Sequence, residues 1–274
     1  MFPFTCLFFA LTFGGESLLT ANEPIQQPTA AQILARWQAA ASTTERLDTT
    51  LTRLIYDHTF KETKVAIGRL YMERSGRCHL RLEPPEKLPV STRQDASGRP
   101  YSTKADVART FIWRPEEFLV IDPIRKESTI YSTKAAAADE HDDTTSGGFF
   151  QFFAKAMRPF ESAAFCKALD EEFLSEFTER FDVSVSHQND ISIISARPKD
   201  NRDARNFKLL KLAFARSSAF PTAMSTLDPA GTKEDVFVFG HPILNVVPRN
   251  ANQLFEPDFE GFHVWVSEPA SDGK

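Results

Sequence analysis

The sequence predicts a mainly β protein with some helices (α+β). We expect a single curved antiparallel sheet, or an incomplete barrel, of about eleven strands covered by N-terminal and central helices. Two patterns predict this class. Polar and apolar side chains alternate with a period of two through most of the chain. Apolar residues take helical spacing at the start and again in the middle.

The first predicted element is a helix that runs to residue 41. Thr29 and Gln32 form a capping box, and apolar residues including Trp37 follow at helical spacing. Because the helix has one apolar face, it is expected to cover part of the sheet.

The strands fall into two series, one on each side of the central helices. The first series covers residues 49–57, 64–73, 77–82, 109–113, 117–121 and 127–132. The polar stretch 91–104 between them is expected to be a loop or an insertion. The second series covers residues 181–187, 191–196, 207–215, 222–227 and 233–239, with a last strand at 262–266.

The central segment contains two predicted helices. Residues 135–146 are polar and acidic and predict a loop, whereas residues 149–157 are apolar on nearly every side and end before Pro159. A second helical stripe of apolar residues runs from 169 to 177.

Composition excludes some classes of partner. The 274 residues contain 32 Lys and Arg against 37 Asp and Glu, for a net charge of -5. This acidic balance argues against binding to nucleic acid or to an anionic membrane. The chain also has 25 Phe against 11 Gly, so we expect either a core packed with Phe or a cavity lined by it.

The N-terminus predicts export. Residues 1–13 are apolar and uncharged but too few to span a bilayer, so 1–21 is interpreted as a signal peptide and 22–28 as a linker. The protein is therefore expected to be periplasmic or secreted. Cys78 and Cys166 would then either pair or remain two buried thiols.

No catalytic or cofactor-binding motif is present. The chain lacks the zinc-protease, nucleophile-elbow, phosphate-loop and dinucleotide patterns, and its six His residues are scattered. The acidic residues 139–143 are the best candidates for a metal site, but a solvated loop explains them better. We therefore predict no enzyme activity, no cofactor and no metal.

Several segments resemble the LolA/LolB-type lipoprotein carriers. Residues 68–74 (Gly-Arg-Leu-Tyr-Met-Glu-Arg) are similar to the family's Gly-x-Leu-Trp-x-x-Arg strand. Residues 118–123 (Phe-Leu-Val-Ile-Asp-Pro) are similar to its Leu-Trp-x-Tyr-(Asp/Asn)-Pro hairpin. Asn245, Phe255 and residues 261–264 resemble its closing segment. The resemblance implies one half-barrel domain over 29–267, followed by a flexible tail at 268–274.

The chain departs from the family pattern in places. Tyr71 stands where the family has Trp, Ser75 where it usually has Pro, and residues 91–104 look like extra sequence. These differences predict a divergent, LolA-like member, for which fold transfers better than function.

The resemblance also implies roles for single residues. Arg74 would hydrogen-bond a helical lid and hold a cavity shut; a surface ion pair is the alternative. Leu70 and Met72 would line the cavity. The lid would be residues 149–157, or else these form an ordinary core helix. Its ligand-facing candidates are Phe149, Phe152, Phe153 and Met157.

We therefore predict a carrier or binding protein that shelters the acyl chains of a lipoprotein or lipid. The alternative is an envelope sensor or scaffold of the same fold that contacts another envelope protein and carries no ligand. A tunnel above a few hundred cubic ångströms would favour the carrier, and a packed interior would favour the scaffold.

Overall fold

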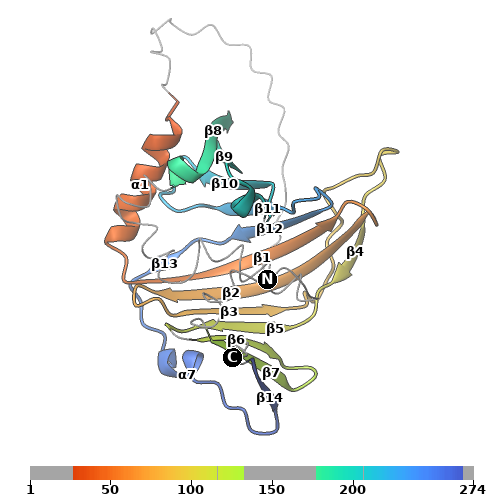
Figure 1. Ribbon diagram of the computed structural model, residues 1–274, viewed down its shortest axis with the longest axis vertical. Coiled ribbons are helices and arrows are strands. Elements are labelled where there is room, and N and C mark those ends of the chain that lie inside the picture. The colour runs from red at the N-terminus through yellow and green to blue at the C-terminus, as the bar shows by residue number, and fades with distance from the viewer. Residues whose placement is uncertain (1–26, 116, 133–176, 206, 268–274) are drawn as a thin grey trace, which may run out of the picture.

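The computed structural model shows one open, curled sheet of fourteen strands, as the alternating pattern predicts (Figure 1). The structure describes residues 27–115, 117–132, 177–205 and 207–267. Twelve strands follow one another across the sheet in the order β14-β7-β6-β5-β3-β2-β1-β12-β11-β10-β9-β8, while β13 pairs with β1 and β4 with β2.

The described elements keep to the expected order. The helices whose full range is described are α1 (Ala30–Ser42), α6 (Asn201–Ala204) and α7 (Ala251–Phe255). The first seven strands are β1 (Arg46–Asp57), β2 (Glu62–Glu73), β3 (Cys78–Glu83), β4 (Ser102–Ala105), β5 (Arg109–Trp113), β6 (Glu117–Asp122) and β7 (Glu127–Ser132). The other seven are β8 (Phe181–Gln188), β9 (Ile191–Pro198), β10 (Leu209–Ala215), β11 (Ala223–Leu227), β12 (Lys233–Phe239), β13 (Ile243–Leu244) and β14 (His263–Ser267).

Helix α1 begins at the capping box that the sequence predicts. The Gln32 side chain accepts a hydrogen bond from the Thr29 amide at 2.8 Å, and the Thr29 hydroxyl accepts one from the Gln32 amide at 3.3 Å. Its buried side chains include Trp37, and the helix lies beside the β8–β10 end of the sheet (Figure 1).

Two antiparallel meanders meet at the centre of the sheet. Strands β1, β2, β3, β5, β6 and β7 form one meander and β8 to β12 the other, and the long β1–β12 pairing joins them. In the tight β8–β9 turn, Asn189 takes a positive φ of 53°, which Asn tolerates better than most residues.

The expected count of about eleven strands is too low, and not every pair is antiparallel. Strand β4 overlaps the end of the stretch 91–104 that was expected to be a loop or an insertion, and it pairs in parallel with β2. Strand β14 pairs in parallel with β7. Strands β4 and β13 have four and two residues, which is too short for a period of two to be recognised.

The two faces of the sheet differ in their packing. The inner face carries the main core, built from strand residues such as Leu80, Leu212 and Phe214 together with the apolar side of α1. The outer face carries a smaller cluster of Tyr71, Ile112, Leu119, Ile121 and Phe255, in which α7 supplies the Phe.

Several sequence predictions lie outside the described residues. These are the signal peptide, the acidic tract, Cys166, most of the second central helix and the whole 149–157 segment, with Phe149, Phe152, Phe153 and Met157. No helix in the described part of the chain is long and apolar enough to cross a bilayer.

Candidate ligand pocket on the inner face

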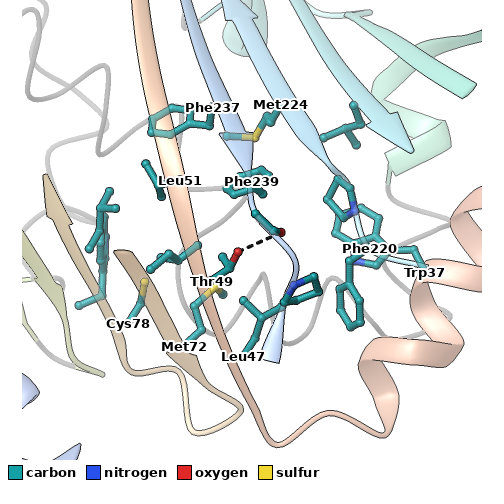
Figure 2. A pocket seen from close by; sticks show the side chains of 17 residues that line it. Trp37, Leu47, Thr49, Leu51, Met72, Cys78, Phe220, Met224, Phe237 and Phe239 are labelled. Atoms are coloured by element: carbon teal, nitrogen blue, oxygen red, sulfur yellow. Dashed lines mark hydrogen bonds between the residues drawn. The ribbon is translucent and has the colours of Figure 1, made fainter. Parts of the chain in front are cut away.

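An apolar pocket of about 70 Å³ lies on the inner face, between the β1–β5 strands and β10–β12 (Figure 2). Trp37 brings α1 into its wall. The remaining lining residues are Leu47, Thr49, Leu51, Leu70, Met72, Cys78, Leu80, Trp113, Leu212, Phe220, Pro221, Met224, Phe237, Phe239, Gly240 and Pro242.

The alternation of the strands explains why these side chains meet. Register places Leu51 opposite Phe239 and Gly68, Thr49 opposite Leu70, and Leu70 opposite Leu80. Directly paired residues share one face of a sheet, so every second residue of four neighbouring strands points into the same space.

The pocket offers almost no hydrogen-bonding capacity. Its one hydroxyl, on Thr49, donates to the main-chain oxygen of Gly240 at 3.1 Å (Figure 2) and lies 3.0 Å from that of Thr50. The Gly240 amide also donates to the Thr50 main-chain oxygen at 2.7 Å, and a glycine is needed for this approach because a Cβ at 240 would stand 2.4 Å from the Thr50 hydroxyl oxygen. With its hydroxyl occupied, the pocket suits a hydrocarbon better than a polar group.

The pocket is small for a ligand site. Its volume of about 70 Å³ lies below the 300–1,000 Å³ of typical small-molecule pockets and below the size expected of a carrier tunnel. Entry of a long acyl chain therefore requires wall side chains to move. Met72 and Met224 are suited to this, because unbranched thioethers change rotamer easily.

A buried ionic cluster lies next to the pocket on the inner face. Arg53 is 3 % exposed and donates from Nη2 to Asp235 at 2.6 Å, with Asp106 at 3.7 Å. Burial opposes the charge of Arg53, but the Asp235 carboxylate outweighs burial and raises the pKa of Arg53. Its guanidinium carbon lies 5.5 Å from the ring centre of Phe237, which also lines the pocket.

Arg74 contacts the end of α1 rather than the pocket itself. Its Nη2 lies within hydrogen-bond distance of the carbonyl oxygens of Ala41 (3.2 Å), Ser42 and Thr44 (3.1 Å). Its Nε lies 2.9 Å from a Glu45 carboxylate oxygen. The Arg74 guanidinium thus links the end of β2 to the C-terminal end of α1. The same helix contributes Trp37 to the pocket lining.

Asn245 fixes the same turn from the other side. Its side-chain oxygen accepts hydrogen bonds from the amides of Glu45 at 2.7 Å and Arg46 at 3.2 Å, and its φ is 59°. The α1–β1 connection is therefore held by two residues that lie far apart in the sequence, Arg74 and Asn245.

The predicted site residues separate into three groups. Leu70 and Met72 do line the pocket. Arg74 lies outside it and contacts α1, and the four residues of the expected lid are among those not described. Sequence reasoning missed Trp37, Phe220, Met224 and Phe237, although the alternating pattern had already placed the last two on strands.

The described residues also bear on the metal prediction. Among them, no three His, Cys, Asp or Glu side chains lie close enough together to hold a metal ion. The acidic tract 139–143 is not among these residues.

Comparison with known proteins finds solved structures of similar shape but no match by sequence. No protein-family model and no curated protein sequence matches the chain. An uncharacterised conserved protein from Thermus thermophilus is 8 % identical with a TM-score of 0.45, over 87 % of this chain and 99 % of that one. A LolA superfamily protein from Nitrosomonas europaea is 10 % identical with a TM-score of 0.34, over 84 % and 98 %.

A third likeness is to MucB in the Pseudomonas aeruginosa MucA/MucB complex, at 11 % identity and a TM-score of 0.37, over 81 % of this chain and 60 % of that one. At such identities the likeness extends to the fold alone. One of these structures is of a LolA superfamily protein, and the motifs at residues 68–74 and 118–123 resemble the lipoprotein carriers of that name.

Proposed function

We propose that this protein binds a single hydrocarbon chain, such as an acyl chain of a lipid or lipoprotein, in the inner-face pocket, without enzymatic activity or cofactor. The observation that carries the proposal is the lining of the pocket. Sixteen of its seventeen residues lack a polar side chain other than a thiol or indole, and the hydroxyl of the other, Thr49, is hydrogen-bonded internally. The proposed compartment is the periplasm or the cell exterior, reached through the N-terminal signal peptide.

The driving force is the removal of methylene groups from water. Each buried methylene contributes about 0.8 kcal/mol, or about a fourfold gain in affinity. A volume of about 70 Å³ is about half of the roughly 150 Å³ cavity that holds one benzene molecule, so the pocket as it stands takes only a short chain. Longer chains need the walls to open.

Helix α1 is the proposed moving wall. It contributes Trp37 to the pocket, and Arg74 and Asn245 hold the turn at its end. Release of the Arg74 contacts would let α1 move from the inner face and enlarge the pocket. Arg74 is thus proposed as the latch of this helix; the roles of Phe149, Phe152, Phe153 and Met157 remain predictions.

A series of straight-chain alcohols from butanol to decanol tests the proposal by titration calorimetry. Affinity should rise about fourfold per methylene until the pocket is filled. Met224→Trp fills the pocket and should weaken octanol binding at least tenfold. Val238→Trp adds the same ring on the outer face of the adjacent strand, where Val238 is 43 % exposed, and should leave binding unchanged. Absence of binding, or equal loss in both variants, would contradict the proposal.

The small volume favours the sensor or scaffold as a second candidate, because a packed inner face needs no ligand. The same titration separates the two. Growth of affinity that continues to decanol supports a carrier with movable walls. A series that shows no gain beyond butanol supports a protein that uses its surface. Native mass spectrometry of the protein from envelope extract would then show a bound protein rather than a lipid.

A further inference from the structure

A second hollow, of about 300 Å³, lies on the outer face of the strands that form the apolar pocket. Its lining includes Lys211, Ser225 and Glu234, whose neighbours Leu212, Met224 and Asp235 face the inner side. Alternation along a strand thus gives β10–β12 an apolar inner site and a charged outer one.

Register explains the floor of this hollow. Lys211 pairs with Ser225, and Leu209 pairs with Leu227, on the adjacent strands β10 and β11. Residues two apart on paired strands share one face, so a Lys–Ser pair stands beside a Leu–Leu pair. Leu227 in turn pairs with Glu234 on β12. The floor therefore offers donors at one end and an apolar surface next to them.

The wall comes from the segment that departs from the family pattern. The Ser91 hydroxyl lies 2.8 Å from the hydroxyl of Thr63 on β2, which anchors this loop to the outer face. Arg93 then projects over Tyr56, with its guanidinium carbon 5.2 Å from the ring centre, and donates to Glu234 at 2.5 Å. The insertion thus carries a cation to the edge of the hollow.

The lining of the hollow carries more positive than negative charge, with Arg93 and Lys211 against Glu234. Glu234 is the one carboxylate of the lining, and it already has Arg93 at 2.5 Å and His58 Nε2 at 3.9 Å. Lys211 and Ser225 are half-buried, and their side chains form no hydrogen bond or ion pair with any residue that the structure describes. An ammonium group and a hydroxyl therefore remain as donors facing the hollow.

We propose that this outer hollow binds a small oxyanion, a phosphate or carboxylate group, attached to an apolar body. Lys211 and Ser225 hold the oxyanion, Arg93 supports it with positive charge, and the Leu209–Leu227 pair contacts the apolar body. Charge-assisted hydrogen bonds from Lys and Arg are the strong interactions available to such a group. The site is separate from the hydrocarbon pocket, because the sheet itself lies between them.

Phenyl phosphate and benzoate are suitable probes, with benzyl alcohol as the uncharged control. Calorimetry and amide chemical shifts of the whole protein should show saturable binding of at least one anion, with shifts at Ser225 and Gly231, and no binding of the alcohol. Binding of only one anion identifies the group that the site prefers. Lys211→Met should weaken that binding at least tenfold, Ser225→Ala about threefold, and Lys211→Arg should retain most of it.

The matched control is Lys126→Met, the same loss of charge in the β6–β7 turn of the other meander, which should leave anion binding unchanged. Circular dichroism checks that each variant is folded. The proposal is overturned if neither anion binds, or if Lys126→Met weakens binding as much as Lys211→Met. Octanol binding should be unaffected by Lys211→Met, so this result is independent of the hydrocarbon pocket.

Discussion

The inner and outer faces of this sheet are built by the same strands, but an ion pair on the inner face and one on the outer face differ in their exposure to water. On the inner face, the ionic cluster beside the pocket is closed: Arg53 is 3 % exposed and paired with Asp235. On the outer face, ion pairs such as Arg81–Glu83 are open to water, with side chains 63 % and 49 % exposed. The difference shows that the part of the inner face around Arg53 and Phe237 is closed to water, which is what a hydrocarbon site requires.

The largest expected effect comes from breaking the inner ion pair. Arg53→Met leaves Asp235 buried without its main partner and should lower the free energy of unfolding by about 3–5 kcal/mol, measured by urea denaturation at pH 7. Arg81→Met on the outer face should cost about 1 kcal/mol or less. Equal costs for the two variants would remove the contrast between the faces.

The next effect concerns pH and the outer cluster under α7. Burial, followed by the charge of Arg81, lowers the pKa of His79 from 6.5 to about 4. In the unfolded chain, His79 therefore takes up a proton near pH 6.5. In the folded protein, it takes up this proton only near pH 4. Stability should be fully present above pH 6.5 and fall by about 3 kcal/mol as pH decreases to 4.

The measurement compares unfolding free energies at pH 7.5, 5.5 and 4.5 for the wild type and His79→Gln. The variant cannot titrate at this position, so its stability should fall less over this range. Parallel pH profiles would mean that His79 is exposed to water, and that the outer cluster around Tyr71 is looser than the burial of its members indicates.

The smallest effect on stability, but a distinct one on kinetics, is expected at Arg74. Its side chain is 39 % exposed, so Arg74→Leu should cost about 1 kcal/mol. If α1 is the moving wall, the same change should speed octanol release several-fold in stopped-flow experiments. Arg74→Lys should fall between, because one ammonium group cannot reproduce the fixed donors of a guanidinium. Unfolding of Arg74→Leu, or unchanged release, would remove the latch role.

The sequence was sufficient for the features that depend on local periodicity. The capping box at Thr29 predicted α1, and alternation predicted eleven strands with boundaries off by at most three residues. Leu70 and Met72 lie two residues apart on β2 and both line the inner-face pocket; their contact with a ligand stays a prediction.

What could not be predicted depends on contacts between distant segments. Arg53 on β1 gave no signal, since its partners Asp106 and Asp235 lie outside its own strand. Nothing local in the segment 91–104 showed that Ser91 would dock against Thr63. The volume of the pocket likewise depends on how side chains from many strands interlock.

Strand β14 has a consequence for biosynthesis. It is the described partner of β7 along that edge, and it begins at His263, more than a hundred residues after β7 ends. While the ribosome is still making the intervening chain, the backbone donors and acceptors of β7 on that side lack this strand. Exposed strand edges template aggregation, so a chain truncated before residue 263 should depend more heavily on chaperones than the full-length one.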